Sequence, residues 1–444
     1  MTPTLIEQES GFVGLARRAR QAAHYLARLS HEIRCEALEI GMALLEERKR
    51  EILEANERDC AIARAKLARG ELSTALFDRL KTSEAGIAHM IRQVGDVMVL
   101  PDPLDKSLSI TELDDNLILE KTACPIGVLG IVFESRPDII SQVVALAIKS
   151  GNSLLLKGGT EARQTNEVLV SIWHDSMARL TDFPLDSINL LHSREDVQEM
   201  LHLDCYIDLI IPRGSRDFVR NVAKHSTIPV LGHGEGLCHI YVDRSADLQK
   251  AADIVFDSKT QYPAACNSVE TLLVHEAVAP DFLPKMIETL RCAGVEVRGC
   301  ARSIALLADI TPASELDWET EYSSLVISVK IVNHCSDALE HIERYGSRHT
   351  ECIITEDQSA AQEFLQKVDA AGVFHNASTR FADGYRYGFG AELGISTGKL
   401  HARGPVGLEG LITYKYLLIG NGQIVATYTN GRRKFKHQSL SPAR

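Results

Sequence analysis

The N-terminal region carries hydrophobic side chains at helical spacing. Ile33, Ala37, Ile40 and Leu44 recur at steps of four, three and four residues, which places them on one face of a helix. The segment PDPLD at 101–105 follows this region. Its prolines fix the backbone and lack an N–H donor, so we expect the helical region to end there.

The hydrophobic pattern changes after residue 105. Residues 107–125 predict two short strands joined by the turn residues 114–116. From residue 127 onward, runs rich in Ile, Leu and Val alternate with segments of helical period, and these runs are 127–134, 152–157, 188–192 and 206–212. The first of these segments predicts a helix with Pro137 near its start and Gly151 past its end. Strands that are almost continuously hydrophobic and separated by helices are typical of a parallel sheet covered on both faces.

A second α/β region begins near Gly232. Its candidate strands are 237–243, 269–275, 325–332 and 349–356. The predicted fold class is therefore α/β, with two domains, the chain passing between them near residue 231, and a ligand cleft.

Composition and charge narrow the range of partners. The chain has 444 residues, of which 45% are hydrophobic and 24% charged, as in a globular protein of two or three domains. Its net charge of −12 repels polyanions, so we expect neither nucleic acid nor an acidic membrane as a partner. The N-terminus does not resemble a signal peptide, and no uncharged apolar run is long enough to span a bilayer. We therefore predict a cytoplasmic protein.

Among the cysteines, Cys266 has the most favourable context for chemistry. The 10 cysteines are scattered without a CxxC pair, and the 16 histidines show no HExxH spacing, so we predict reduced thiols and no metal site. Cys266 lies in QYPAACNSVE at 261–270, in a predicted loop with small neighbours. Such a loop admits a substrate carbonyl to a nucleophilic thiol. On local context alone, a buried and inert cysteine remains the alternative.

Other positions suit a phosphate or ribose. Gly214 and Ser215 lie where a buried strand turns into a helix, so backbone N–H groups and the helix dipole face the sheet edge. Lys157 ends another strand. On local context alone, a plain turn at Gly214 and Ser215 and a simple end of burial at Lys157 are the favoured alternatives. The segment GHGEG at 232–236 has GxGxG spacing and precedes a strand, so it is a tight turn near a ligand or a structural loop, not a dinucleotide fingerprint.

The segment 375–405 is rich in glycine and charged residues. This composition suits a loop that binds an anionic substrate, or an ordered loop at a subunit contact.

Taken together, the motifs resemble one enzyme family. They are FESRPD at 133–138, IIPRGS at 210–215, STIPVLGHGEGLCHIYVD at 226–243, YPAACNSVETLLVH at 262–275, HNASTRFADGYR at 375–386 and HARGPVGLEGL at 401–411. In this order they resemble the gamma-glutamyl phosphate reductases of the aldehyde dehydrogenase superfamily, from about residue 10 to about residue 420. No kinase module precedes residue 1, so the resemblance is to the stand-alone reductase rather than to the bifunctional synthases.

The resemblance implies an organisation of the chain. It implies an NADP(H)-binding domain, a catalytic domain with the nucleophilic cysteine, oligomerisation strands and a segment that links them and binds substrate. These parts correspond respectively to 1–105 with 124–231, to 232–380, to 106–123 with 400–422, and to 381–399. A homo-oligomer is implied as well.

The resemblance also implies roles for individual residues. Cys266 stands at the position of the nucleophile, and Asn267 would donate a backbone N–H to the oxyanion. Lys157, Gly214 and Ser215 match cofactor-binding elements for NADPH, and Glu321 matches the glutamate that holds the nicotinamide ribose. The superfamily's oxyanion asparagine is replaced near Arg136, in FESRP, where an arginine would hold the leaving phosphate. His401 and Arg403 are candidates for substrate binding or a subunit contact.

The implied reaction is the second step of proline biosynthesis from glutamate. L-glutamyl 5-phosphate, the product of a glutamate 5-kinase, is reduced with NADPH to L-glutamate 5-semialdehyde and phosphate through a thioacyl-Cys266 intermediate. Because no water attacks the thioester, we expect Glu235 of GHGEG not to act as a water-activating base.

Two alternatives remain open. A CoA-acylating aldehyde dehydrogenase shares the thioacyl intermediate, and HARGP with ASTRFADG argues against it. A scaffold without turnover is disfavoured by YPAACN.

Overall fold

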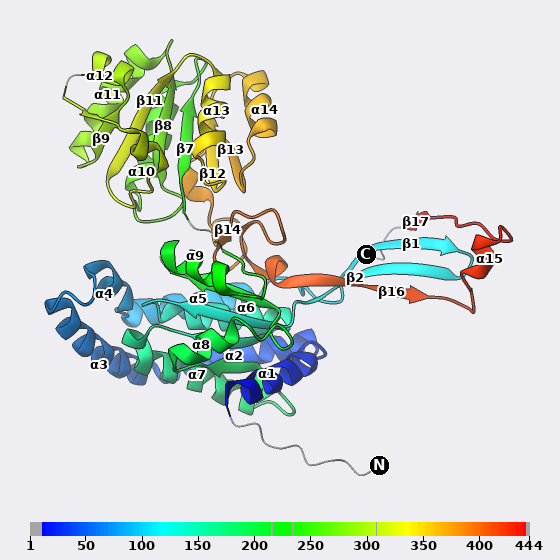
Figure 1. The fold of residues 1–444 in the computed structure, drawn as a ribbon. Coiled ribbons are helices and arrows are strands. Elements are labelled where there is room, and N and C mark those ends of the chain that lie inside the picture. The colour runs from blue at the N-terminus through cyan, green and yellow to red at the C-terminus, as the bar shows by residue number, and fades with distance from the viewer. Residues whose placement is uncertain (1–10, 215, 233–234, 308, 441–444) are drawn as a thin grey trace. The chain divides into compact units, whose positions relative to one another are not determined.

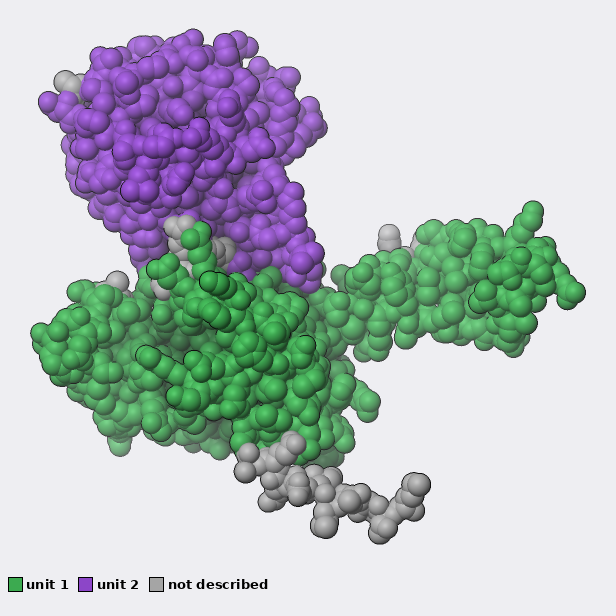
Figure 2. Space-filling model, in the orientation of Figure 1, with its two compact units in different colours: residues 1–231, 389–393, 406–444 green, residues 232–388, 394–405 purple. Residues whose placement is uncertain are grey.

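The computed structural model describes residues 11–214, 216–232, 235–307 and 309–440. The chain forms two compact units (Figure 2). Unit 1 comprises Met1–Leu231, Phe389–Leu393 and Val406–Arg444, and unit 2 comprises Gly232–Gly388 and Gly394–Pro405. The chain therefore passes between the units more than once.

Unit 1 begins with the predicted helical region, which is confirmed. Serine side chains cap three of its helices: Ser30, Ser73 and Ser83 each accept a hydrogen bond from a backbone N–H of the first turn. The helices are α1 (Phe12–Leu26), α2 (His31–Glu47), α3 (Lys49–Ala68), α4 (Thr74–Leu80) and α5 (Glu84–Met98). Within the described ranges, no helix is both long and apolar enough to cross a membrane.

A four-stranded parallel sheet forms the centre of unit 1 (Figure 1). Its strands lie in the order β5 (Ile188–Leu190), β4 (Ser153–Lys157), β3 (Val128–Phe133) and β6 (Leu209–Arg213). Every residue of β3 and β4 is buried, which confirms the expectation from their continuous hydrophobic runs. The connecting helices are α6 (Asp138–Ser150), α7 (Arg163–Ala178) and α8 (Arg194–Met200), and α9 (Arg216–His225) follows β6.

Gly151 shows how local sequence ends one of these helices. It follows α6 with a φ of 73°, a left-handed conformation that favours glycine. The helix starts directly after Pro137. The predicted limits of this helix are confirmed.

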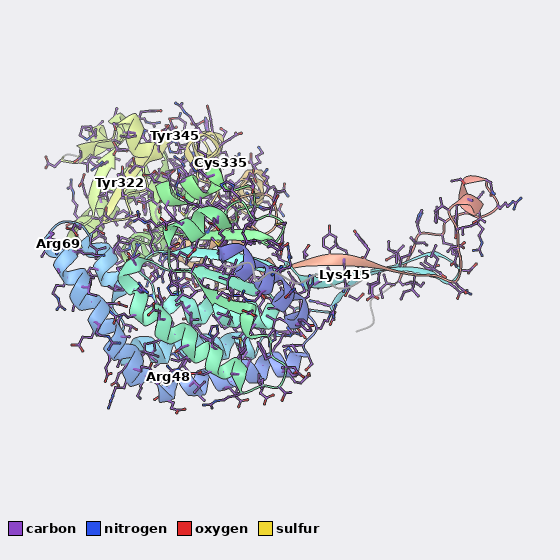
Figure 3. The ribbon with its side chains drawn as sticks, turned by 60° about the horizontal axis from the view of Figure 1, so that its bottom comes forward. Arg48, Arg69, Tyr322, Cys335, Tyr345 and Lys415 are labelled. Atoms are coloured by element: carbon purple, nitrogen blue, oxygen red, sulfur yellow. The ribbon has the colours of Figure 1, made fainter. Side chains whose placement is uncertain are left out.

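A second sheet of unit 1 is antiparallel and forms an arm. The strands lie in the order β16 (Ile412–Ile419), β2 (Leu117–Pro125), β1 (Ser107–Asp114) and β17 (Gln438–Leu440). The predicted turn at 114–116 joins β1 and β2, with Asn116 at a φ of 59°. Lys415 marks β16 in Figure 3. The short helix α15 (Ala426–Thr429) lies between β16 and β17 in sequence.

Unit 2 is built on a seven-stranded parallel sheet. The strand order is β10 (Thr311–Pro312), β9 (Glu296–Gly299), β11 (Val326–Val332), β8 (Val269–His275), β7 (Cys238–Val242), β12 (Thr350–Ile354) and β13 (Gly372–His375). Its helices are α10 (Leu248–Thr260), α11 (Ala279–Cys292), α12 (Ala301–Leu306), α13 (Cys335–Tyr345) and α14 (Gln358–Lys367). A two-stranded ribbon of β14 (Ile395–Ser396) and β15 (Gly404–Pro405) completes the unit. The predicted α/β class is confirmed in both units.

Candidate active site

Cys266 lies in the short loop that connects α10 to β8 in unit 2. The loop is folded by two backbone hydrogen bonds, from Ala265 N to Tyr262 O at 3.2 Å and from Ser268 N to Ala265 O at 2.9 Å. Cys266 is half-buried, so its thiol is held by the loop and is not sealed in the core. The predicted loop position before a buried strand is confirmed.

The backbone of Cys266 packs against residues at the start of β7 and just before it. The buried Cys238 thiol donates to the Cys266 carbonyl oxygen across 3.3 Å. A Cβ atom on Gly236 would lie 1.9 Å from that same carbonyl oxygen, so no residue larger than glycine fits there. This close approach gives the last glycine of GHGEG a structural role beside Cys266. His233 and Gly234 of that segment lie outside the described residues.

Asn267 fixes the other side of the loop. Its side chain is buried, and Nδ2 donates to Ala382 O at 2.8 Å and lies 3.5 Å from Arg380 O. Among the described residues, no hydrogen-bond partner is found for the Asn267 backbone N–H. This N–H is thus available next to the sulfur, as an oxyanion donor must be.

A buried ion pair joins the two ends of the Cys266 loop. Lys259, near the end of α10, donates to Glu270 Oε2 at 2.7 Å and to Val269 O at 3.0 Å. Neither charged side chain is exposed. Burial raises the pKa of the Glu270 carboxyl to about 7, although Lys259 lowers it. The ion pair therefore holds together the helix before Cys266 and the strand after it.

Glu321 belongs to the same region of unit 2. Ser323, two residues further along the chain, donates a backbone N–H to Glu270 Oε1 at 3.2 Å. The hydroxyl of Tyr322 (labelled in Figure 3), which directly follows Glu321, donates to Asp317 Oδ1 at 2.8 Å. Burial chiefly raises the pKa of the Cys238 thiol, and the Glu321 carboxylate raises it further. Unit 2 therefore brings Cys266, Asn267 and Glu321 into one region.

Unit 1 brings together three other predicted residues. Lys157 ends β4, Arg136 follows the end of β3, and Gly214 follows the end of β6. These strands are parallel neighbours in register, so their carboxyl ends meet at one sheet edge. A Cβ on Gly214 would lie 2.6 Å from Glu134 Oε2, so a side chain there would require Glu134 to move. Arg136 is partly exposed, and its Nη2 lies 3.3 Å from Asp138 Oδ2.

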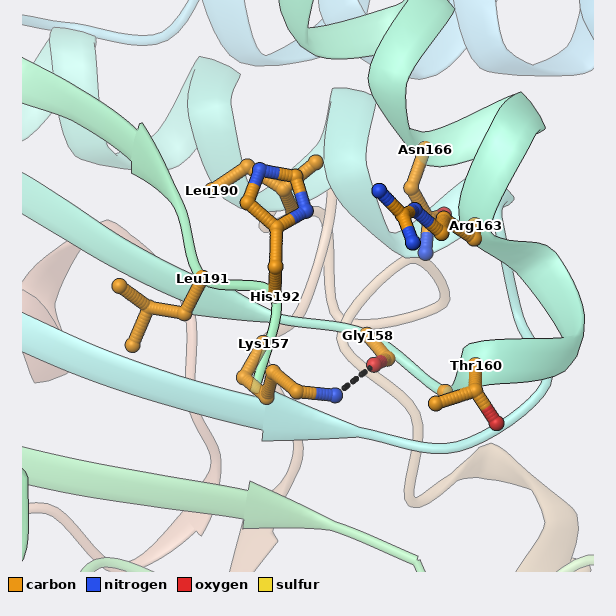
Figure 4. Close-up of a pocket in the computed structure, with 9 residues that line it drawn as sticks. Lys157, Gly158, Thr160, Arg163, Asn166, Leu190, Leu191 and His192 are labelled. Atoms are coloured by element: carbon orange, nitrogen blue, oxygen red, sulfur yellow. Dashed lines mark hydrogen bonds between the residues drawn. The ribbon is translucent and has the colours of Figure 1, made fainter. Parts of the chain in front are cut away.

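A pocket lies beside Lys157 (Figure 4). The Lys157 side chain is largely buried and donates to Gly158 O at 2.7 Å. Burial lowers the pKa of its ammonium group, and Glu161 partly offsets this effect. The pocket is also lined by Gly159, Thr160, Arg163, Asn166, Leu190, Leu191 and His192.

The remaining predicted residues lie elsewhere. Ser215 lies outside the described residues. His401 is exposed, and Arg403 pairs with Asp369, its Nη2 lying 2.9 Å from Oδ1. Glu235 precedes Gly236 and is half-buried.

Sequence reasoning missed Lys259, Glu270 and Arg380. All three contact the loop that carries Cys266 or the residues at its ends. Lys259 and Glu270 flank that loop in the sequence, and their opposite charges could have indicated an ion pair across it.

The larger part of the chain matches a known protein family. Residues 12–298 match the family model described as "Aldehyde dehydrogenase family". The chain therefore belongs to the aldehyde dehydrogenase family.

Relatives over almost the whole chain are gamma-glutamyl phosphate reductases. The one from Synechococcus sp. (strain JA-3-3Ab) is 51% identical over 98% of this chain and 97% of its own. The one from Cyanothece sp. (strain PCC 7425 / ATCC 29141) is 53% identical over 96% of this chain and 97% of its own. The crystal structure of the Thermotoga maritima gamma-glutamyl phosphate reductase superposes with a TM-score of 0.89 at 42% identity, covering 93% of this chain and 99% of that one. The resemblance inferred from the motifs is confirmed.

Proposed function

We propose that this protein reduces L-glutamyl 5-phosphate to L-glutamate 5-semialdehyde and phosphate, with NADPH as reductant and Cys266 as nucleophile. The observation that carries the proposal is the accessible Cys266 loop, supported by Gly236, Cys238 and Asn267. It occurs in a chain about half identical to curated gamma-glutamyl phosphate reductases over nearly their full length. The reaction would be the reductive step of proline biosynthesis.

The chemistry begins at the sulfur. The Cys266 thiolate attacks the acyl carbonyl carbon, and the carbonyl oxygen gains negative charge in the tetrahedral intermediate. The Asn267 backbone N–H stabilises that oxyanion, because its side chain is already bonded elsewhere and holds the residue in place. The carbon–oxygen bond to phosphate then breaks, and the acyl group remains on sulfur as a thioester. Arg136 holds the departing phosphate.

The residues at the sheet edge of unit 1 fit NADPH. The Oδ1 atom of Asn166 is buried and finds no hydrogen-bond partner among the residues that the structure describes, so the pocket contains an acceptor that a ribose hydroxyl would satisfy. A Cβ on Gly158 would lie 2.2 Å from Asn166 Nδ2 and 3.0 Å from the Phe133 ring, so a side chain there would displace Asn166. Lys157 and Arg163 supply positive charge for the phosphates, and Gly214 follows the end of β6 at the same sheet edge.

When bound, NADPH supplies the hydride that reduces the thioester carbon, and Glu321 holds its nicotinamide ribose. The protein's part is then to release the product: the carbon–sulfur bond breaks, the Cys266 sulfur leaves as thiolate, and the aldehyde forms. No water needs activation in this direction, so the mechanism requires no general base at Glu235.

The arm supports the proposal of a homo-oligomer. Strand β16 is an edge strand of its sheet, and it leaves hydrophobic side chains exposed, namely Tyr414, Tyr416, Leu417, Leu418 and Ile419. An exposed hydrophobic edge strand is a pairing surface. We infer that a second copy of the chain covers it. Leu418→Lys should shift the molar mass measured by light scattering toward the monomer, and an unchanged mass would contradict this inference.

The function is tested in the reverse direction. The protein is mixed with glutamate 5-semialdehyde and NADP⁺, and NADPH formation is followed with added phosphate, added CoA or neither. We expect sustained turnover only with phosphate, and no turnover with Cys266→Ala. Turnover that requires CoA would instead assign a CoA-acylating enzyme.

A further inference from the structure

Arg380 is a buried cation whose side chain contacts the loop that carries Cys266. It lies in a short 3₁₀ helix, Thr379–Phe381, that follows β13 in unit 2. The Thr379 N–H donates to Ser258 Oγ at 3.2 Å, and Asn267 Nδ2 donates to Ala382 O. The backbone around Arg380 is thereby fixed to residues on both sides of Cys266.

The Arg380 side chain returns to the same loop. Its Nε donates to Gln261 Oε1 at 2.9 Å, and its Cζ lies 5.9 Å from the centroid of the Tyr262 ring. Only 7% of the residue is exposed. Two of its neighbours, Gln261 and Tyr262, begin the segment that carries Cys266. The hydrogen bond to Gln261 thus orients the Nε edge of the guanidinium, and the Tyr262 ring contacts its face.

The other edge of the guanidinium has no partner in the described part of the chain. No hydrogen bond is found there for Nη1 or Nη2, and no carboxylate oxygen lies within ion-pair distance. Burial lowers the pKa of Arg380, and the positive charge of Arg386 lowers it further. The charges of Asp383 and Cys266 act in the opposite direction. A desolvated cation in this state is unfavourable unless an anion occupies the site.

The second arginine increases this preference for an anion. Arg386 Nη1 donates to Arg380 O at 2.7 Å, and its charge is shared with Asp383 at 3.6 Å. The segment therefore carries two guanidinium groups, and in the described chain Asp383 is the one carboxylate within ion-pair distance of either. A planar carboxylate matches the free Nη edge of an arginine, because two parallel N–H groups meet its two oxygens.

We propose that Arg380 binds the α-carboxylate of the substrate and so selects an amino-acid acyl chain at Cys266. This inference rests on the proposed function, in which the substrate carries an acyl phosphate at one end and a carboxylate at the other. Arg136 is assigned to the phosphate, which leaves the carboxylate for Arg380. The substrate would thus be held at its non-reacting end by the loop segment that also fixes Asn267.

The experiment compares two aldehydes in the reverse reaction. One is glutamate 5-semialdehyde, and the other is 4-aminobutanal, which is the same molecule without the carboxylate. For Arg380→Met we expect kcat/KM for the semialdehyde to fall about 10- to 100-fold, the value of a charged hydrogen bond. The kcat/KM for 4-aminobutanal and the KM for phosphate should stay at the wild-type level.

Three results overturn the inference. An equal loss for both aldehydes would mean that Arg380 acts on Cys266 or on the fold. A raised KM for phosphate alone would assign Arg380 to the leaving group. Wild-type kcat/KM for both aldehydes would show that Arg380 does not take part in substrate recognition. Arg344→Met is the matched control, because Arg344 is an exposed arginine of unit 2 paired with Glu315, and it should change neither substrate's kinetics.

Folding and the proposed function are checked separately. The melting temperature and NADPH affinity of Arg380→Met should match those of the wild type, and Arg380→Lys should recover part of the selectivity. If the wild type itself shows no phosphate-dependent NADP⁺ reduction, the proposed function fails. If the wild type is active and only the selectivity prediction fails, the inference about Arg380 alone is wrong.

Discussion

Lys259 and Glu270 form an ion pair of 2.7 Å whose two side chains are wholly buried at opposite ends of the Cys266 loop. Lys259 also donates to Val269 O, and Glu270 also accepts from Ser323 N. The pair therefore connects α10, β8 and the loop that carries Glu321. It positions residues of the site without contacting the reacting atoms.

Removing one partner of this pair should be costly. Lys259→Met leaves the Glu270 carboxylate buried without its cation, so we expect the free energy of unfolding to fall by about 3–5 kcal/mol. The double variant Lys259→Met/Glu270→Leu should lose less than the single one, since no charge is left unpaired. Urea unfolding of the three proteins measures this order.

The control for that pair lies on the same helix. Lys250 of α10 pairs with Glu356 at 2.6 Å, but both side chains are exposed. Lys250→Met should therefore change the denaturation midpoint little. A loss in Lys250→Met as large as that in Lys259→Met would show that burial of the pair is not the cause.

Gly236 should tolerate no side chain. In Gly236→Ala the new methyl group would meet the Cys266 carbonyl oxygen at 1.9 Å, so the nucleophile loop must move. We expect a strong fall in kcat and an altered rate of Cys266 alkylation by iodoacetamide, followed by peptide mass spectrometry. Gly95→Ala is the matched control, because its nearest neighbour would be Met42 Sδ at an ordinary 3.5 Å. Wild-type kcat in Gly236→Ala would refute the close approach.

Lys157 should act on the cofactor alone. It lines the pocket of unit 1 and its ammonium group is largely buried, so Lys157→Met removes a cation that the cofactor phosphates or ribose would contact. The KM for NADP⁺ should rise while the KM for glutamate 5-semialdehyde stays unchanged in the reverse assay. An effect confined to the semialdehyde would count against the assignment.

His341 should make the fold sensitive to acid. Burial, together with the charges of His239, Lys330 and Arg344, lowers its pKa from 6.5 to about 2. The Lys330 ammonium group donates to its Nδ1 at 3.0 Å, which also requires an unprotonated ring nitrogen. The folded protein therefore keeps His341 neutral, whereas the unfolded chain binds a proton as the pH falls through 6.5.

The direction of the pH effect follows. Stability from His341 is present above pH 6.5 and is lost as the pH falls, by at most about 1.4 kcal/mol per pH unit. His341→Gln keeps an acceptor for Lys330 and removes the titration, so its stability should fall less steeply between about pH 6.5 and pH 5. Denaturant unfolding across this range measures the slope. Equal slopes in the two proteins would exclude His341 as the cause.

Local sequence predicted much of this structure because its signals are local. The continuous hydrophobic run of β8 and the small residues before it placed Cys266 in a loop at a strand end. The Gly151 signal ended α6 where expected. Lys157 and Gly214 were expected at strand ends, and the parallel register of the sheet brings those ends together.

Other features depend on contacts between distant residues. Arg380 reaches Gln261 across 119 positions of sequence, and no local period predicts that pairing. The chain also crosses between the units around residues 388–406, where glycine and charge indicate a loop but not its destination. Burial of Lys259 with Glu270 requires the packed sheet of unit 2, although their opposite charges were visible.

The central claim is a thioacyl group on Cys266 that phosphate, and not water, removes. The most direct measurement mixes the protein with glutamate 5-semialdehyde and NADP⁺ without phosphate and records NADPH formation over time. We predict a burst that stops at one NADPH per active site, with an acyl adduct on the Cys266 peptide, and sustained turnover once phosphate is added. Steady turnover without phosphate, or a burst of the same size in Cys266→Ala, would contradict the account.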